Sequence, residues 1–124
     1  MGKKIDADKA PKIFHVNWFR QDEEGNFMWP GFGDNMRVLL WILDRCEGKK
    51  DAEESAIGYL PKKGDIDTTD LDIDAATMEE LLTVDKAVWL EDVANQEAYF
   101  AQFGDKLPAE IKAELETLKA NLSK

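Results

Sequence analysis

The stretch that decides how this chain folds begins with Asn17-Trp18-Phe19-Arg20 and resumes, after a polar turn, as Phe27-Met28-Trp29-Pro30-Gly31-Phe32-Gly33-Asp34-Asn35. Flat aromatic rings held on short loops offer surfaces on which a planar ligand can stack. Glycines beside them let backbone N–H and C=O groups approach the edge of such a ligand. No other part of the sequence offers comparable chemistry, so we expect any binding function to lie here.

The residues around this stretch predict a β-hairpin. Ile13–Phe19 is rich in β-branched and aromatic residues and favours a strand. Gln21–Asn26 is polar and predicts the turn, with Gly25 able to take a positive φ. Phe27–Trp29 would form the returning arm, which Pro30-Gly31 ends.

The remainder of the chain predicts mainly helices. They are expected over Met36–Glu47, from Thr77 to about Leu82, from Asp85 to Phe103, and from Pro108 onward. Asp34 or Asn35 would cap the first helix and Gly48 would end it. The second would open with the capping-box spacing of Thr77–Glu80, and Asp85 would cap the third.

Apolar spacing indicates which helix faces are buried. Trp89, Val93 and Phe100 share one stripe of the third helix, and a matching stripe lies on the last helix. That second stripe consists of Ile111, Leu115, Leu118 and Leu122. Ala56–Pro61 predicts one more short strand, whereas residues 1–10 and 49–55 predict loops.

These elements predict an α+β fold, with an N-terminal hairpin and short strands followed by four helices. We treat residues 1–124 as a single segment, with the hairpin and its loop at 11–35 and a helical remainder at 36–124. A chain of 124 residues that is 44% hydrophobic can bury a modest core.

Charge and hydropathy exclude several function classes. A net charge of −10 repels phosphate backbones and anionic membranes, so neither nucleic acid nor a membrane is an expected partner. The longest apolar run, Val38–Leu43, is too short to span a bilayer. The first residues carry lysines with no apolar stretch behind them, so we expect no secretory signal and a cytoplasmic location by default.

Metal and nucleophile motifs have weak support. Cys46 stands alone and is expected to be a small core residue, while His15, the only histidine, is expected to be buried and hydrogen-bonded. A calcium loop starting at Asp70 lacks the required glycine and the final glutamate. Gly31–Gly33 is a lone GxG with no Lys-Ser/Thr behind it, so it does not make a phosphate loop.

The aromatic residues have a structural interpretation as well as a binding one. Phe14 and Trp41 are best explained as core, and Trp18 and Trp29 can be core as well. Turn and glycine positions surround three further rings, which leaves both interpretations open for them from the residues alone. These are Phe19, Phe27 and Phe32.

Two segments closely resemble the C-terminal part of the GTP-dependent phosphoenolpyruvate carboxykinases. They are Pro11-Lys12-Ile13-Phe14-His15-Val16-Asn17-Trp18-Phe19-Arg20 and Phe27-Met28-Trp29-Pro30-Gly31-Phe32-Gly33-Asp34-Asn35-Met36-Arg37-Val38-Leu39. Similarity continues more weakly through Ile57–Pro61 and the helices beyond. The resemblance covers nearly all of this chain but only the last part of the family's usual length. It implies a piece of a mixed α/β nucleotide-binding domain.

The resemblance implies that the guanine ring of GTP or GDP lies among the phenylalanines of the opening stretch. The implied stacking residues are Phe19, Phe27 and Phe32 with Trp18 adjacent, and the implied polar contacts come from Gly33, Asp34 and Asn35. Stacking on an aromatic ring is worth about 1–3 kcal/mol per base but does not identify the base. Discrimination needs matching donors and acceptors, and the amide of Asn35 has both.

What the resemblance does not supply limits the expected function. The family's phosphate loop, reactive cysteine, manganese or magnesium ligands and oxaloacetate-binding arginines are implied to lie upstream. We therefore expect no catalytic or metal-binding residues here, and expect that the chain alone cannot convert oxaloacetate and GTP into phosphoenolpyruvate, CO₂ and GDP, the gluconeogenic reaction of the family.

The resemblance suggests a fragment, and the uncovered apolar run Val38–Leu43 suggests that the isolated chain can self-associate. The expected partners are therefore a guanine nucleotide and the remainder of the parent enzyme. The alternative, from another class, is a non-catalytic protein-interaction module that uses an exposed aromatic and apolar surface.

Overall fold

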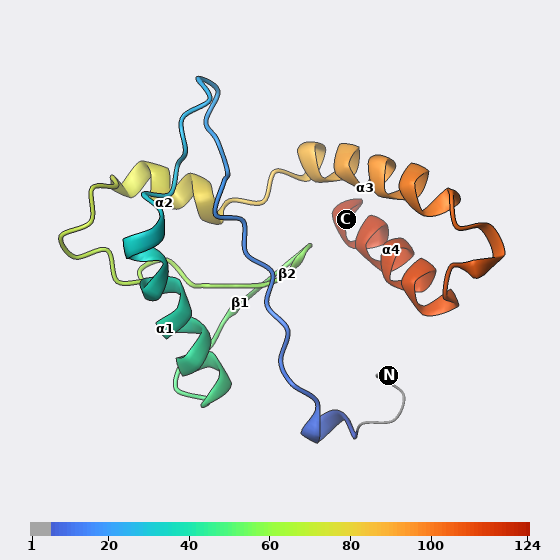
Figure 1. Cartoon of the computed structure of the whole chain (residues 1–124), viewed down its shortest axis with the longest axis horizontal. Helices are drawn as coiled ribbons and strands as arrows, with labels where there is room; N and C mark the ends of the chain where they lie inside the picture. Colours follow the sequence, from blue (N-terminus) through green and yellow to red (C-terminus); the bar gives the residue numbers. More distant parts are fainter. Residues whose placement is uncertain (1–5) are drawn as a thin grey trace. The chain divides into compact units, whose positions relative to one another are not determined.

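The computed structural model describes residues 6–124 and gives an α+β chain (Figure 1). Its elements are α1 (Asn35–Cys46), β1 (Glu53–Ser55), β2 (Gly58–Leu60), α2 (Ala75–Leu82), α3 (Lys86–Ala101) and α4 (Ala109–Leu122), with short 3-10 turns at Ala7–Lys9, Phe32–Asp34 and Gly104–Lys106. The α+β class and the four helices are confirmed. Residues 1–5, part of the predicted N-terminal loop, lie outside the described residues.

The chain forms two compact units. The first comprises the described residues up to Asp51 together with Pro61–Leu81, and the second comprises Ala52–Leu60 and Leu82–Lys124. The aromatic stretch, α1 and all of α2 except its last residue, Leu82, therefore belong to the first unit, whereas the β1–β2 pair, α3 and α4 belong to the second.

The predicted strand at Ile13–Phe19 is wrong. Residues 13–17 form no ladder, Trp18 and Phe19 lie in a turn, and Ile13 is 92% exposed. The hairpin is reduced to a single antiparallel bridge between Gln21 and Phe27, with the N–H of Met28 donating to the carbonyl of Arg20 at 2.9 Å. High strand propensity reflects packing on a half-buried sheet, and within residues 6–124 this segment has no neighbouring strand to pack against.

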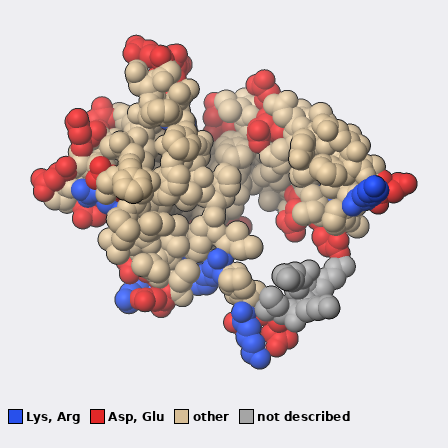
Figure 2. All heavy atoms as spheres, viewed as in Figure 1, with Lys and Arg blue, Asp and Glu red and all other residues tan. Residues whose placement is uncertain are grey.

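The turn of this reduced hairpin is held by one carboxylate. Asp22 accepts from the backbone N–H groups of Glu24 and Asn26, both at 2.9 Å. The hydrogen bond from the Asn26 N–H lowers the pKa of Asp22, because it stabilises the charged carboxylate. Figure 2 shows acidic side chains gathered over the tip of this turn.

Helix α1 begins and ends within one residue of its predicted limits. Gly48 follows its last turn with φ of 73°, a left-handed conformation that ends helices readily. Asp34 is the N-cap residue by position, but its side chain makes no capping bond. At the other end, the Lys12 ammonium donates to the carbonyl of Arg45 at 3.0 Å, which ties the segment around Lys12 to the negative end of the helix.

One face of α1 is buried and another is open. Trp41 is 6% exposed, which confirms its predicted core role. It meets Phe14 edge to face with 6.2 Å between ring centroids, but Phe14 is only half-buried, so its predicted core role is confirmed in part. The open face carries side chains at i, i+3, i+4 and i+7 spacing that are 40–54% exposed. We call it the α1 stripe: Met36, Leu39, Leu40 and Leu43.

The predicted strand at Ala56–Pro61 is confirmed in part as β2. Its antiparallel partner β1, in register Glu53 opposite Leu60, lies where the sequence predicted a loop. The missed strand is three residues long and charged, so it carries no strand signal of its own.

Helix α2 is capped differently from the prediction. Asp74 accepts from the N–H of Thr77 at 2.7 Å, so the helix begins two residues before the expected capping box. The hydrogen bond from Thr77 lowers the pKa of Asp74.

Helices α3 and α4 form an antiparallel pair that carries the core of the second unit (Figure 1). Asp85 caps α3 as predicted, accepting from the N–H of Ala87 at 2.9 Å. Val93, Leu115 and Leu122 are 1–8% exposed and form the centre of the cluster. The remaining members of the predicted stripes that pack against it are Trp89, Phe100 and Leu118, joined by Ala56 and Ile57 from the β1–β2 connection.

None of the helices in the described part of the chain is both long enough and apolar enough to cross a membrane.

Candidate functional site

The reduced hairpin brings Phe19 and Phe27 together. Their ring centroids lie 5.8 Å apart at an interplanar angle of 61°, and the side chains are 72% and 60% exposed. Phe19 is held by its own backbone, whose N–H donates to the side-chain oxygen of Asn17 at 3.0 Å. Two large apolar rings thus stand next to each other in solvent, where an aromatic ligand could cover them.

Gly31 sets the position of the third ring. Its φ of 107° and ψ of −150° belong to a region that essentially only glycine adopts. The chain then enters the 3-10 turn at Phe32, whose side chain is 95% exposed. Gly33 is exposed and has no atom within 4 Å of the place a Cβ would occupy, so its backbone is open to approach.

Asn35 is partly buried and joined to a buried neighbour. The Nε1–H of Trp29 donates to its Oδ1 at 2.9 Å, and Trp29 itself is only 6% exposed. Indole nitrogen is a donor only, so this bond requires the amide oxygen to face Trp29. The two N–H groups of the Asn35 amide are left for other partners.

Asp34 is engaged by a cation. Its carboxylate accepts from Nε of Arg37 at 3.0 Å, and the same guanidinium donates through Nη1 to the carbonyl of Asp67 at 2.9 Å. Arg37 thus joins the start of α1 to the acidic loop before α2. The backbone N–H of Thr69 lowers the pKa of Asp67, with Arg37 adding a smaller contribution in the same direction.

A second arginine anchors the hairpin, and nothing in the sequence pattern had marked it. Nη1 of Arg20 donates to the carbonyls of Glu80 and Leu81 at 3.1 and 3.3 Å, near the C-terminal end of α2. Terminal helix carbonyls lack intrahelical partners and attract cations, which explains the contact. The sequence shows Arg20 as a charged residue inside an aromatic segment, but it gives no indication of the hydrogen-bond acceptor, which lies 60 residues away on Glu80.

The structure therefore brings together some of the predicted site residues and not others. Phe19 contacts Phe27, but within residues 6–124 no ring contact joins Phe32 to either. Trp18, which precedes Phe19 in the sequence, is half-buried. Asp34 already accepts a hydrogen bond from Arg37, and Asn35 accepts one from Trp29. The site is an open arrangement of exposed rings next to fixed polar groups rather than a closed cavity.

Other predicted candidates do not form sites. His15 is exposed, so its expected burial is wrong, because the strand that would have buried it does not form. The thiol of Cys46 is likewise exposed, since the last turn of α1 faces solvent at that position. Among residues 6–124 no three His, Cys, Asp or Glu side chains come close enough together to hold a metal ion.

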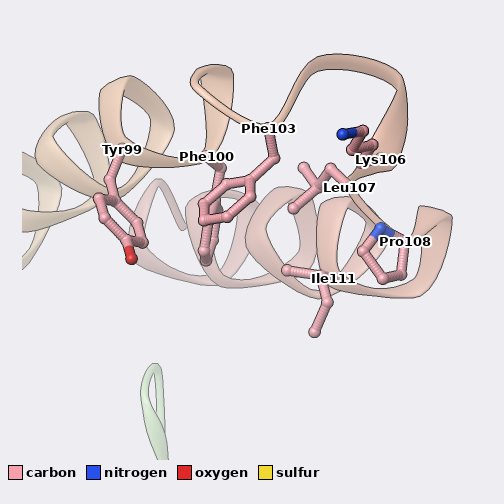
Figure 3. A pocket seen from close by; sticks show the side chains of 7 residues that line it. All are labelled: Tyr99, Phe100, Phe103, Lys106, Leu107, Pro108 and Ile111. Atoms are coloured by element: carbon pink, nitrogen blue, oxygen red, sulfur yellow. The ribbon is translucent and has the colours of Figure 1, made fainter.

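The second unit contains an apolar groove that the sequence had not indicated (Figure 3). It has a volume of about 230 Å³ and lies between the end of α3 and the start of α4. Its lining consists of Tyr99, Phe100, Phe103, Lys106, Leu107, Pro108 and Ile111. The lining is mainly apolar and offers burial, and Tyr99 and Lys106 are the titratable residues in it.

Comparison with known proteins identifies similar sequences over the whole chain. A family model described as "Phosphoenolpyruvate carboxykinase C-terminal P-loop domain" matches residues 1–121. Proteins named "Phosphoenolpyruvate carboxykinase [GTP]" are 46% identical over 99% of the chain in Treponema pallidum, 48% over 98% in Paenarthrobacter aurescens and 51% over 96% in Neocallimastix frontalis. The chain spans 20% of the length of each of these relatives.

Proposed function

The chain belongs to the phosphoenolpyruvate carboxykinase C-terminal P-loop domain family, and from this premise we propose that residues 18–35 bind the guanine ring of GTP or GDP. The relatives carry GTP in their names. The aromatic stretch is the part of this chain whose chemistry suits a purine base.

The exposure of the three phenylalanines carries this proposal. Phe19, Phe27 and Phe32 are 72%, 60% and 95% exposed, whereas Trp29 and Trp41 are buried. Large rings left in solvent at glycine and turn positions gain most when a flat ligand covers them. Each base–ring contact would contribute about 1–3 kcal/mol.

Polar groups beside the rings support a preference for guanine. The Asn35 amide has N–H groups available next to Phe32, and the exposed backbone at Gly33 offers further donors and acceptors. Guanine presents an acceptor at O6 and donors at N1 and N2. A site that pairs these groups rejects a base that would leave them unpaired.

The wider activity is proposed for the longer protein. We propose that the chain acts as part of a GTP-dependent phosphoenolpyruvate carboxykinase, which decarboxylates oxaloacetate and phosphorylates the product. Its partners would be guanine nucleotide and the remainder of that enzyme, in the cytoplasm. No step of the chemistry is assigned to these residues. The sequence has no GxxxxGK[ST] phosphate loop, and residues 6–124 contain no cluster of three His, Cys, Asp or Glu side chains.

Nucleotide titration tests the base-binding role. We expect GDP to quench the fluorescence of Trp18 and to bind more tightly than ADP. Phe32→Ala should weaken GDP binding about tenfold or more, because one stacking surface is lost. The matched control is Phe103→Ala, which removes a 45%-exposed ring from the other unit and should change nothing. Equal binding of GDP and ADP, or GDP binding unchanged by Phe32→Ala, would overturn the proposal.

A second candidate is docking of a protein partner on the α1 stripe. The stripe places four apolar side chains, 40–54% exposed, on one helix face, an arrangement typical of covered helices. A chain that binds no nucleotide but loses a partner or self-contact when the stripe is made polar would favour this function.

A further inference from the structure

The hydrogen bond between Trp29 and Asn35 decides which end of an amide faces the predicted ligand. Asn35 carries an oxygen and a nitrogen at nearly identical positions, and a rotation of 180° about χ2 exchanges them. Trp29 can only donate, and it does so to Oδ1 at 2.9 Å. The exchanged orientation would set the amide N–H groups against the indole N–H and leave a buried donor unpaired.

Burial makes this orientation persistent. Trp29 is 6% exposed, so its indole cannot turn to water for another acceptor without losing its packing. Asn35 is only partly buried, so its NH₂ group remains accessible on the side away from Trp29. The buried residue thus fixes the hydrogen-bonding character of the accessible one.

The fixed donor lies beside the ring that would stack on the base. Phe32 opens the 3-10 turn Phe32–Asp34, and Asn35 follows it as the C-cap residue with helical φ and ψ, so the two side chains, three residues apart, lie on the same side. A base resting on Phe32 would therefore have its edge near the Asn35 NH₂ group.

We propose that Trp29 is a positioning residue that makes this site select purines with an oxygen at C6. Guanine and hypoxanthine present the C6 carbonyl as an acceptor for Asn35 Nδ2–H, whereas adenine presents an amino donor that meets another donor. The inference rests on the proposed guanine-binding role and adds a residue that would not touch the nucleotide. Its effect passes through the orientation of Asn35.

Trp29→Phe tests the inference because phenylalanine keeps most of the buried ring but removes the N–H. Once that donor is gone, the amide can exchange its ends and accept from adenine. The chain supplies a matched control in Trp41, also 6% exposed, whose Nε1–H has no hydrogen-bond partner among the described residues. Trp41→Phe therefore makes the same substitution without breaking a hydrogen bond.

The measurement is a ¹H–¹⁵N NMR titration of the full chain with GMP, IMP and AMP, which share one ribose phosphate. IMP keeps the C6 oxygen of GMP and lacks only its 2-amino group. We expect Trp29→Phe to reduce the preference for GMP over AMP, and for IMP over AMP, by at least about fivefold. The preference for GMP over IMP should stay the same, and Trp41→Phe should keep all three ratios.

Several results would overturn the inference. One is a Trp29→Phe chain that retains the full preference for GMP over AMP while wild type shows that preference. Equal losses in Trp41→Phe would assign the effect to core packing instead. A wild-type chain that binds GMP no better than AMP would overturn the proposed function, and this inference with it. A wild-type chain that prefers GMP, with a Trp29→Phe variant that keeps the preference, would overturn the inference alone.

A second variant guards against a folding defect in Trp29→Phe. Asn35→Asp keeps the acceptor for Trp29 but replaces the outward donor with an acceptor. It should abolish the preference for GMP and IMP over AMP with the Trp29 indole N–H signal still protected from exchange. An unchanged preference in this variant would also overturn the inference.

Discussion

Nη1 of Arg20 lies 3.1 Å from the carbonyl oxygen of Glu80. This bond, with its neighbour to Leu81, joins the aromatic turn to the end of α2 across 60 residues of sequence. The position of Phe19 therefore depends on a helix that follows it far along the chain.

Arg20→Ala should lower the free energy of unfolding by about 1–2 kcal/mol, because two helix carbonyls lose their donor. Arg20→Lys should restore only part of this, since an ammonium lacks the planar fork. Urea unfolding measures both. The matched control is Lys63→Ala, which breaks an exposed ion pair with Glu79 on the same helix and should cost about 0.5 kcal/mol or less. Equal costs for Arg20→Ala and Lys63→Ala would contradict the anchoring role.

Gly31→Ala should destabilise the chain by about 1–3 kcal/mol, because alanine is strained at φ of 107° although no atom stands within 4 Å of its Cβ. Gly33→Ala is the control: it has the same open surroundings without the positive φ, and should cost about 1 kcal/mol at most. The melting temperatures of the two variants separate the effect of backbone strain from the effect of adding a methyl group. Identical melting temperatures would show that the Gly31 backbone does not hold this conformation.

The stability of the chain should fall as the pH drops below the ordinary aspartate pKa of 3.8, partly through Asp74. The Thr77 N–H lowers the folded-state pKa of Asp74, so its stabilising contribution is present above the unfolded pKa and is lost as pH falls through the folded one. Asp74→Asn, which can still accept a hydrogen bond, should show a smaller stability difference between pH 5 and pH 3. A difference as large as that of wild type would mean that other carboxylates account for it.

Trp41→Phe should change the free energy of unfolding by about 1 kcal/mol or less. The smaller ring loses some packing against Phe14, but the variant also removes a buried N–H that has no partner in the described part of the chain. Trp41→Ala should instead cost about 3–5 kcal/mol, because it leaves a cavity. Denaturant midpoints compare the two. A large loss in Trp41→Phe would indicate that the indole N–H has an acceptor, such as a water molecule.

The α1 stripe should make the chain self-associate at high concentration. Replacing Leu40 and Leu43, each 54% exposed, with lysine should shift sedimentation toward the monomer, because the charges oppose burial of the stripe. Ile13→Lys is the control, since Ile13 is 92% exposed but does not belong to the stripe. A sedimentation coefficient that is independent of concentration in wild type would rule out this association.

Local signals in the sequence were sufficient for much of the fold. Gly48 marked the end of α1, Asp85 marked the start of α3, and the apolar spacing of α4 identified Leu115 and Leu122 as core. These features depend on residues within one or two helical turns of each other, so they can be predicted from the local sequence. The sequence set Phe19, Phe27 and Phe32 apart by their turn and glycine positions but left open whether they are core, and the structure shows them exposed.

Features that depend on distant residues were missed or wrong. Ile13–Phe19 has the composition of a strand but no partner strand among the described residues, and β1 has a partner but no strand composition. The anchoring of Arg20 was equally invisible, because its acceptors lie on α2.

The sequence by itself determined the family, the helices and the set of aromatic rings, because these follow from residue identity and short-range spacing. Only the tertiary structure decided which polar groups lie next to those rings. The orientation of the Asn35 amide is the clearest case: the sequence supplies both a donor and an acceptor, and burial of the Trp29 indole leaves the donor facing outward.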